Sequence, residues 1–114
     1  MTCIFCQIIK GEAVGQILYR DEQVTAFRDV HPIAPVHVLV VPNRHINSLE
    51  EAGEADEALL GHMLRVGRQM AAKEGVRDSG YRLVINTGPD AGQSVLHLHL
   101  HAIGGRPLPF RFEK

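Results

Sequence analysis

The sequence predicts an α+β protein, with one antiparallel β-sheet of five strands, one short helix and one long helix. Three observations lead to this prediction. The segments that alternate polar and apolar residues are short and follow one another closely, which is typical of antiparallel strands. One longer segment repeats apolar residues at spacings of three and four, which is typical of an amphipathic helix. The 114 residues have the length of one ordinary domain, so we expect a single domain over 1–114 with a C-terminal tail at 106–114.

The first part of the chain is expected to form the short helix and three strands. CIFCQIIKGE predicts one or two helical turns that stop near Gly11. Residues 17–21 and 23–30 are short alternating or apolar runs, and they predict two hairpin strands. The valine-rich segment 36–42 predicts a buried strand that follows the proline-containing loop HPIAP and ends at Pro42.

The second part of the chain is expected to form the long helix and two more strands. Residues 48–51 resemble a capping box, so a helix could begin there, but the helical pattern is clear only over 56–74. Gly75 follows as a natural C-cap. Residues 81–88 and 95–105 predict the last two strands. The apolar stripe of the helix consists of Leu59, Leu60, Met63, Val66, Gly67 and Met70.

Composition narrows the classes of function. The hydrophobic fraction of 45% and the charged fraction of 22% are those of a soluble globular protein. The net charge of −1 gives no reason to expect a nucleic acid as partner, although a small phosphate-bearing ligand needs only local donors. The sequence contains no apolar run of about 18 residues, and its N-terminus does not resemble a signal peptide. We therefore expect a cytoplasmic protein that does not span a membrane.

The sequence HLHLH at 97–101 places three histidines at alternate positions. On a strand they would project from one face, about 7 Å apart, while Leu98 and Leu100 would project from the other. Three interpretations are open: a polar strand face in solvent, a catalytic zinc held by three imidazoles, or a nucleophilic histidine assisted by its neighbours. The loop 89–94 favours the third, because its backbone N–H groups and the Ser94 hydroxyl could bind an anion beside the strand.

Cys3 and Cys6 form a C-x-x-C sequence with three possible meanings. A redox pair would normally follow a strand and begin a long helix, whereas this pair lies at the extreme N-terminus. Two thiols packed in the interior are a second possibility. A zinc site is the interpretation that we favour, because two thiolates three residues apart can reach one ion and would need two further ligands.

HLHLHAI fits the signature of the histidine-triad (HIT) family, in which three histidines alternate with apolar residues. GQSVLHLHLHAIGGR and FRDVHPIAPVHVLVVPNRHI closely resemble its nucleotide-binding branch, the nucleoside phosphoramidases, and the resemblance runs from Cys3 to about Arg106. It implies a HIT-like fold, a homodimer, and hydrolysis of purine nucleoside phosphoramidates. Two alternatives stay open: a dinucleoside polyphosphate hydrolase, or a zinc-bearing nucleotide-binding or interaction protein with little turnover.

The resemblance also implies roles for individual residues. His99, the middle histidine, would attack the α-phosphate and form a nucleotidyl-histidine. His101 would contact the phosphate, His37 would support the nucleophile, and Ser94 and Gln93 would contact the phosphate or the leaving group. The polar nucleotide-binding positions would be Asp29, Asn86, Gln93, Ser94, His99 and His101. Apolar residues that could line a base pocket, or could equally be core residues, are Ile4, Phe5, Ile8, Phe27 and Val30.

For the cysteine pair, the resemblance implies one structural zinc ion per chain, held by Cys3, Cys6, His45 and His97. Such a closed Cys2His2 site would brace the structure, and through His97 it would steady the segment that carries His99. The tail departs from several relatives, which end in a Trp-Pro-Pro segment, because this chain has no tryptophan. Phe110 and Phe112 could still cross a dimer.

Overall fold

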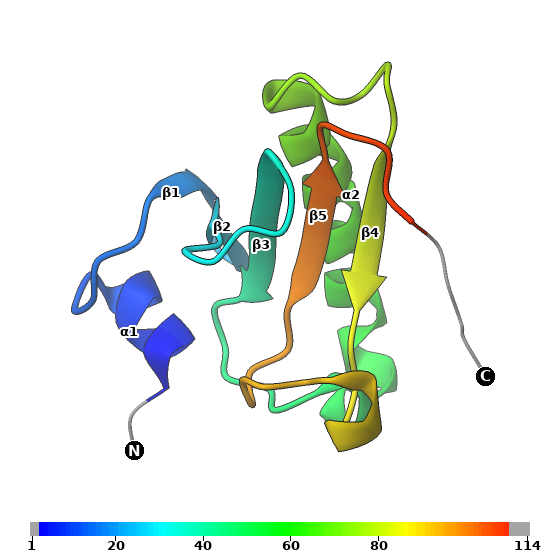
Figure 1. Ribbon diagram of the computed structural model, residues 1–114. Helices are drawn as coiled ribbons and strands as arrows, with labels where there is room; N and C mark the ends of the chain where they lie inside the picture. The colour runs from blue at the N-terminus through cyan, green and yellow to red at the C-terminus, as the bar shows by residue number, and fades with distance from the viewer. Residues whose placement is uncertain (1–2, 110–114) are drawn as a thin grey trace.

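The computed structural model describes residues 3–109, so Phe110 and Phe112 lie outside the described residues. It contains one five-stranded antiparallel sheet in the order β1-β2-β3-β5-β4, with α2 packed along one face (Figure 1). The strands are β1 (Ile17–Arg20), β2 (Val24–Arg28), β3 (Val36–Pro42), β4 (Tyr81–Ile85) and β5 (Leu100–Gly104). The helices are α1 (Ile4–Lys10) and α2 (Glu57–Lys73), with 3-10 turns η1 (Leu49–Glu51), η2 (Glu54–Asp56) and η3 (Pro89–Ala91). The predicted α+β class, with one long and one short helix, is confirmed.

The face of the sheet that α2 covers is a continuous apolar core. Met63 and Val66 of α2 are fully buried against the inward-facing residues of β2, β3 and β5. The helix lies close against the sheet at Gly67, where an added Cβ would lie 2.8 Å from Leu100 Cδ2. A side chain there would force helix and sheet apart, so the glycine allows the close packing. Within residues 3–109, neither helix combines the length and the apolar character that crossing a bilayer requires.

The opposite face of the sheet is covered at one end only. Phe5 and Ile8 of α1 pack on Phe27, Leu39 and Val41, which belong to β2 and β3. The rest of this face, over β5 and β4, lies under no helix, and the loop between β2 and β3 crosses in front of β3 (Figure 1). One face of the sheet therefore supplies the main core, and the other leaves room for a site.

The predicted strand over 95–105 is wrong for its first half, because β5 begins only at Leu100. The Leu98 N–H donates to the Ile46 carbonyl at 2.7 Å, so a loop takes this hydrogen bond in place of a neighbouring strand. Leu98 and Leu100 nevertheless both belong to the core on the α2 side. His97 and His99 thus lie on an irregular segment, and only His101 lies in the ladder. Strands β2 and β4 are also shorter than predicted, ending at Arg28 and Ile85.

The start of the long helix is interrupted. Ser48 Oγ accepts from the Glu50 N–H at 3.2 Å, but the turn that it caps contains only Leu49–Glu51. The chain then reaches a second short turn, and α2 begins at Glu57. At the other end, Glu74 is the C-cap and the next residue, Gly75, adopts φ +83°, a left-handed conformation that glycine adopts without steric cost. The helical pattern therefore predicted the main helix, while the capping pattern at 48–51 marks only a 3-10 turn.

Candidate active site and metal centre

A cavity of about 640 Å³ opens on the partly covered face of the sheet. Its walls come from α1, from the loop between β2 and β3, and from β3, β4, β5 and the segment before β5. Most of the residues predicted from the sequence line it: Ile4, Phe5, Ile8, Phe27, Asp29, Val30, His37, Asn86, Ser94, His99 and His101. Residues that were not predicted also line it: His31, Ile33, Leu39, Arg82, Val84, Val95 and Ile103.

The antiparallel register explains why two histidines from distant parts of the sequence meet in this cavity. His101 on β5 lies opposite Leu39 on β3 and Val84 on β4, and His37 on β3 lies opposite Ile103. His37 and His101 are therefore diagonal neighbours on one face. Their rings are 5.1 Å apart, and His37 Nε2 lies 2.9 Å from His101 Nδ1.

The hydrogen bonds of His37 and His101 assign the proton on each ring. The Ile33 N–H donates to His37 Nδ1 at 3.2 Å, so the neutral ring carries its hydrogen on Nε2. That hydrogen points to His101 Nδ1 at 2.9 Å, with Asp29 Oδ2 at 3.3 Å as a second acceptor. His101 consequently carries its own hydrogen on Nε2, which is buried and has no partner among residues 3–109. A donor is thus left for a ligand in the cavity.

His99 carries its hydrogen on the other ring nitrogen. Its Nδ1 lies 2.7 Å from the His97 carbonyl oxygen, which can only accept, so Nδ1 carries the hydrogen and Nε2 keeps the lone pair. The ring is packed by the edge of Phe5 at 5.2 Å and by His101 at 4.9 Å between ring centres. A fixed ring with a free lone pair on a cavity wall is what a nitrogen nucleophile requires.

Burial keeps the His37 and His101 rings neutral. Burial, followed by the neighbouring His99 and His37, lowers the pKa of His101 to about 4, against the opposing effect of Asp29. Burial also lowers the pKa of His37, with Asp29 opposing and His99 adding to the effect. The fraction of each imidazole that is protonated at neutral pH is therefore small, which the hydrogen-bond assignment above requires.

The remaining predicted polar residues divide into two groups. Asp29, Asn86 and Ser94 line the cavity, and the Ser94 side chain is exposed to it. Gln93 does not line it. The Gln93 amide instead donates to the Asn47 and Val95 carbonyls at 2.8 and 3.1 Å and accepts from the Gly88 N–H at 3.0 Å. The side chain of Gln93 therefore ties three backbone segments together behind the site.

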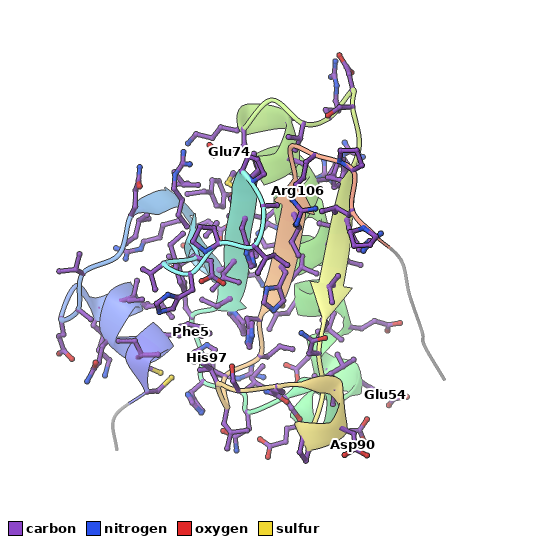
Figure 2. All side chains as sticks on the ribbon, in the orientation of Figure 1. Phe5, Glu54, Glu74, Asp90, His97 and Arg106 are labelled. Atoms are coloured by element: carbon purple, nitrogen blue, oxygen red, sulfur yellow. The ribbon has the colours of Figure 1, made fainter. Side chains whose placement is uncertain are left out.

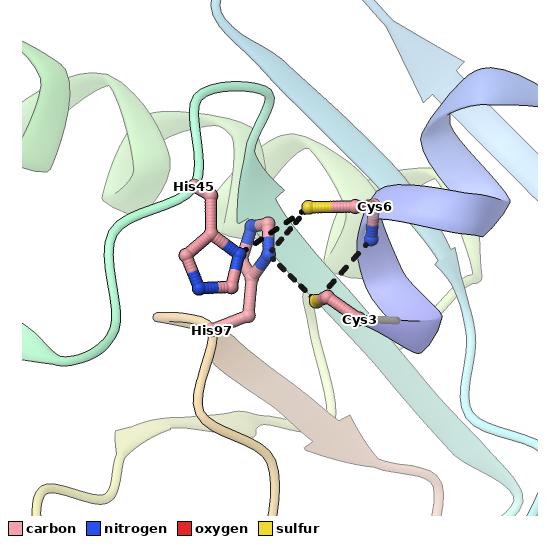
Figure 3. Close-up of side chains that lie close together, drawn as sticks. All are labelled: Cys3, Cys6, His45 and His97. Carbon is pink, nitrogen blue, oxygen red and sulfur yellow. Dashed lines mark hydrogen bonds between the residues drawn. The ribbon is translucent and has the colours of Figure 1, made fainter. Parts of the chain in front are cut away.

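The two cysteines and two histidines predicted as zinc ligands converge at the N-terminus of α1 (Figure 3). The four ligand atoms all lie within 4.8 Å of one another. His97 Nδ1 lies 3.3 Å from Cys3 Sγ and 3.6 Å from Cys6 Sγ, and His45 Nδ1 lies 3.3 Å from Cys6 Sγ. The sulfur and nitrogen ligands of a tetrahedral zinc ion are separated by about 3.5 Å, so these residues fit a metal ion.

The outer hydrogen bonds of the two histidines support the same conclusion. His97 Nε2 donates to the Pro42 carbonyl at 2.9 Å, and His45 Nε2 donates to Asn47 Oδ1 at 2.7 Å. Both Nδ1 atoms therefore present lone pairs to the thiols, the arrangement that metal-binding histidines usually have. Burial lowers the pKa of His97, with the hydrogen bond to Pro42 opposing, which also favours the neutral ligand form.

Asp29, His37 and His101 are a second group close enough to hold a metal ion. Here, however, the facing atoms already form a hydrogen-bonded chain, and His37 Nε2 carries a hydrogen in place of a lone pair. This group therefore serves better as an oriented row of donors than as a metal site.

Some residues of the site could not be found from motif or family resemblance. Arg82 and Val84 line the cavity because the alternation in β4 points them away from the α2 core, to which Leu83 contributes. That alternation was visible in the sequence. The role of the Ile33 N–H was not, because it depends on the path of a loop.

Comparison with known proteins shows the family to which the chain belongs. A family model of the HIT domain matches residues 10–108. The chain is 45% identical over 105 residues to the purine nucleoside phosphoramidase of Escherichia coli, which covers 92% of this chain and 88% of that protein.

Two solved structures are similar to the whole fold. A HIT family hydrolase from Legionella pneumophila superposes with a TM-score of 0.92 at 38% identity, covering 96% of this chain and 97% of that one. A Zn-bound histidine triad family protein from Mycobacterium smegmatis superposes with a TM-score of 0.80 at 31% identity, covering 93% and 76%. Because the family model spans most of the sequence and similar proteins match nearly its full length, the chain belongs to the HIT family and is a hydrolase of that family.

Proposed function

We propose that this chain hydrolyses purine nucleoside phosphoramidates at the α-phosphorus, through a covalent nucleotidyl-histidine on His99. The observation that carries this proposal is that His99 and His101 carry their hydrogens on different ring nitrogens, Nδ1 in His99 and Nε2 in His101. His99 presents a lone pair, because its Nδ1 hydrogen is bound to the His97 carbonyl, while the neighbouring His101 presents a buried hydrogen with no partner among the described residues. A nucleophile beside a donor matches the needs of phosphoryl transfer.

The proposed reaction has two displacements. His99 Nε2 attacks phosphorus, the P–N bond to the amine breaks, and the amine leaves with a proton that it takes up from solvent. Water then attacks the phosphorus of the nucleotidyl-histidine and gives a proton back to solvent, the P–N bond to His99 breaks, and the nucleotide and the neutral imidazole are released. The hydrogen on His101 Nε2 would stabilise the charge that develops on a phosphoryl oxygen in both steps. The Ser94 hydroxyl is exposed at the cavity and would hydrogen-bond the leaving nitrogen.

The nucleoside would lie toward α1. Phe5, Ile8, Phe27 and Leu39 form one apolar cluster at this end of the cavity, which suits a purine ring. Asp29 lines the same cavity, with Oδ2 3.3 Å from His37 Nε2, and its carboxylate can accept from both ribose hydroxyls. Asn86 would contribute to the phosphate site.

We propose one structural zinc ion per chain at Cys3, Cys6, His45 and His97. The ligand separations and the outer hydrogen bonds support this assignment, and the similar Mycobacterium smegmatis protein is described as Zn-bound. Four protein ligands close the site, so the ion would stabilise the fold and leave the chemistry to His99. The reduced thiols that such a site needs are typical of the cytoplasm.

We also propose a homodimer that joins the β4 edges of two copies. β4 is an edge strand, and the adjacent surface of α2 exposes Leu64, which is 48% accessible. A hollow beside it is lined by Leu64, Tyr81 and Leu83, so a second copy would bury apolar surface and pair the open edge. Sedimentation of the wild type and of Leu64→Asp tests this, since the charge should yield monomers.

The proposed activity is tested by release of AMP from an adenosine phosphoramidate and from a dinucleoside polyphosphate, with the wild type and His99→Ala. We expect the phosphoramidate to be the better substrate and the variant to lose at least about 10³-fold in kcat. A nucleotidyl adduct in mass spectra of rapidly quenched wild type should be absent from the variant. Equal turnover by both proteins would exclude His99 as the nucleophile.

A further inference from the structure

We propose that Arg106 is a positioning residue for the reaction, because it fastens the loop between β2 and β3 at Ile33 and so fixes which nitrogen of His101 carries the hydrogen. The inference rests on the proposed function, in which that hydrogen binds a phosphoryl oxygen. Arg106 itself is exposed, lies just beyond β5, and is absent from the cavity lining.

The contacts form a continuous chain from the surface to the cavity. Arg106 Nη2 donates to the Ile33 carbonyl at 2.8 Å, and the Ile33 N–H donates to His37 Nδ1 at 3.2 Å. His37 Nε2 donates in turn to His101 Nδ1 at 2.9 Å. Figure 2 shows Arg106 beside the loop that carries Ile33. Each bond in this chain has only one assignment that gives every neutral ring one hydrogen.

The loop needs such an anchor, because Ala34 is its only buried side chain between His31 and Pro35. Ile33 is 60% exposed and Val30 is 72% exposed, so little apolar packing holds the loop in place. A second contact lies next to Arg106: Gly105 adopts φ +99°, and a Cβ there would lie 2.9 Å from Pro35 Cβ. The residues after β5 therefore hold this loop by a hydrogen bond at Ile33 and by close packing at Pro35.

Releasing the loop would change which nitrogen of His37 and of His101 carries the hydrogen. Without the Ile33 N–H at Nδ1, Asp29 Oδ2 at 3.3 Å still favours the hydrogen on His37 Nε2, but less strongly than both contacts together, so a fraction of the His37 rings would carry it on Nδ1. In that fraction His101 would have to donate from Nδ1, and its Nε2 would present a lone pair to the phosphoryl oxygen. The loss should fall on kcat more than on KM, because the contact strengthens as charge develops in the transition state.

The test compares Arg106→Ala with Arg106→Lys, which keeps a donor for the Ile33 carbonyl, and with Gly105→Ala, which disturbs the same loop and changes no charge. Arg77→Ala is the control for loss of a surface arginine, since Arg77 is exposed and contacts only the adjacent Asp78 among the described residues. Two quantities are measured: kcat and KM with an adenosine phosphoramidate, and the ¹⁵N shifts of the imidazoles at neutral pH. The shifts report which ring nitrogen carries hydrogen whether or not the protein turns over substrate.

We expect Arg106→Ala and Gly105→Ala to lose about tenfold in kcat with KM changed less than about twofold, which is below the 10²–10³-fold cost of removing a whole donor. The His37 and His101 signals should show a mixture of tautomers in both variants, and Arg106→Lys should restore the wild-type shifts and most of kcat. Unchanged shifts in Arg106→Ala, or a Lys variant as impaired as the Ala variant, would overturn the proposal. Absence of turnover in the wild type would contradict the proposed function instead, while the shifts would still test the link from Arg106 to His101.

Discussion

The two faces of the sheet differ in the polar atoms that they bury. On the α2 face, Met63, Val66, Leu98 and Leu100 belong to an apolar core in which shape complementarity is the main requirement. On the other face, imidazole rings stand in a cavity and the His101 Nε2 donor has no partner among residues 3–109. A buried donor without a partner costs stability, so the second face is organised for a ligand at the expense of the fold.

The segment before β5 joins these two environments. Leu98 faces the core, while His97 and His99 on either side of it face the metal centre and the cavity. A shift of one residue would exchange these positions and place histidines in the core. The hydrogen bond from the Leu98 N–H to the Ile46 carbonyl therefore secures the chemistry as well as the fold.

The largest expected effect on stability comes from a truncation on the α2 face, which should leave turnover unchanged. Met63→Ala removes a fully buried side chain from the α2 face and should lower the free energy of unfolding by about 2–5 kcal/mol. Turnover by the fraction that remains folded should stay close to that of the wild type, because Met63 does not line the cavity. Urea denaturation and kcat, measured on the same preparation, check this. A large loss of kcat with unchanged stability would refute the separation of the faces.

A substitution on the cavity face should have the opposite result and lower kcat more than stability. His101→Ala should lower kcat by about 10²–10³-fold, since it removes the donor that the structure leaves for a ligand. Its effect on stability should be smaller than that of Met63→Ala. The matched control is His62→Ala on α2. His62 Nε2 donates to Asp21 Oδ2 at a distance of 2.6 Å, and His62 does not line the cavity. That variant should lose some stability and keep kcat, and an equal loss of kcat in both would indicate a general effect of losing a histidine.

The two faces also differ in how far the sequence alone could predict them. Periodicity predicted the α2 stripe and the inward direction of Leu98 and Leu100, because side-chain alternation follows from local backbone geometry. The resemblance supplied the four residues that converge at the metal centre. Neither predicted that β5 begins only at Leu100 or that Gln93 holds backbone segments and lies outside the cavity lining. Those features depend on hydrogen bonds between loops that are distant in the sequence, which periodicity cannot reveal.

Removal of the proposed zinc ion should have a somewhat smaller effect on stability than the core truncation. Chelation should lower the free energy of unfolding by about 3 kcal/mol relative to protein with free zinc at 100 times its Kd. Turnover should decline with loss of structure and not immediately on chelation, because Cys3 and Cys6 hold α1 and do not line the cavity. Thermal denaturation with and without chelator measures this, and Cys3→Ser should already unfold at the lower temperature. An immediate and complete loss of kcat in a protein that remains folded would contradict a structural role.

The smallest effect is the dependence of stability on pH. Burial, with the neighbouring His99 and His37, lowers the pKa of His101 from 6.5 to about 4 in the folded protein. Between these values the unfolded chain binds a proton at this position that the folded chain does not, so the stability present above pH 6.5 is lost as the pH falls toward 4. Because the ring is partly accessible to water, we expect its contribution to be about 1 kcal/mol, well below the full value of such a shift.

His101→Ala isolates this contribution, because it removes the titrating group. Unfolding free energies of the wild type and the variant, measured from pH 7 to pH 4, should converge by about 1 kcal/mol as the pH falls. His37 titrates in the same direction, since burial also lowers its pKa, so the variant should retain part of the slope. Parallel curves would mean that His101 is protonated as easily in the folded protein as in the unfolded chain. In that case the cavity face would be hydrated enough to stabilise an imidazolium, and its contrast with the apolar α2 face would be smaller than the ring contacts indicate.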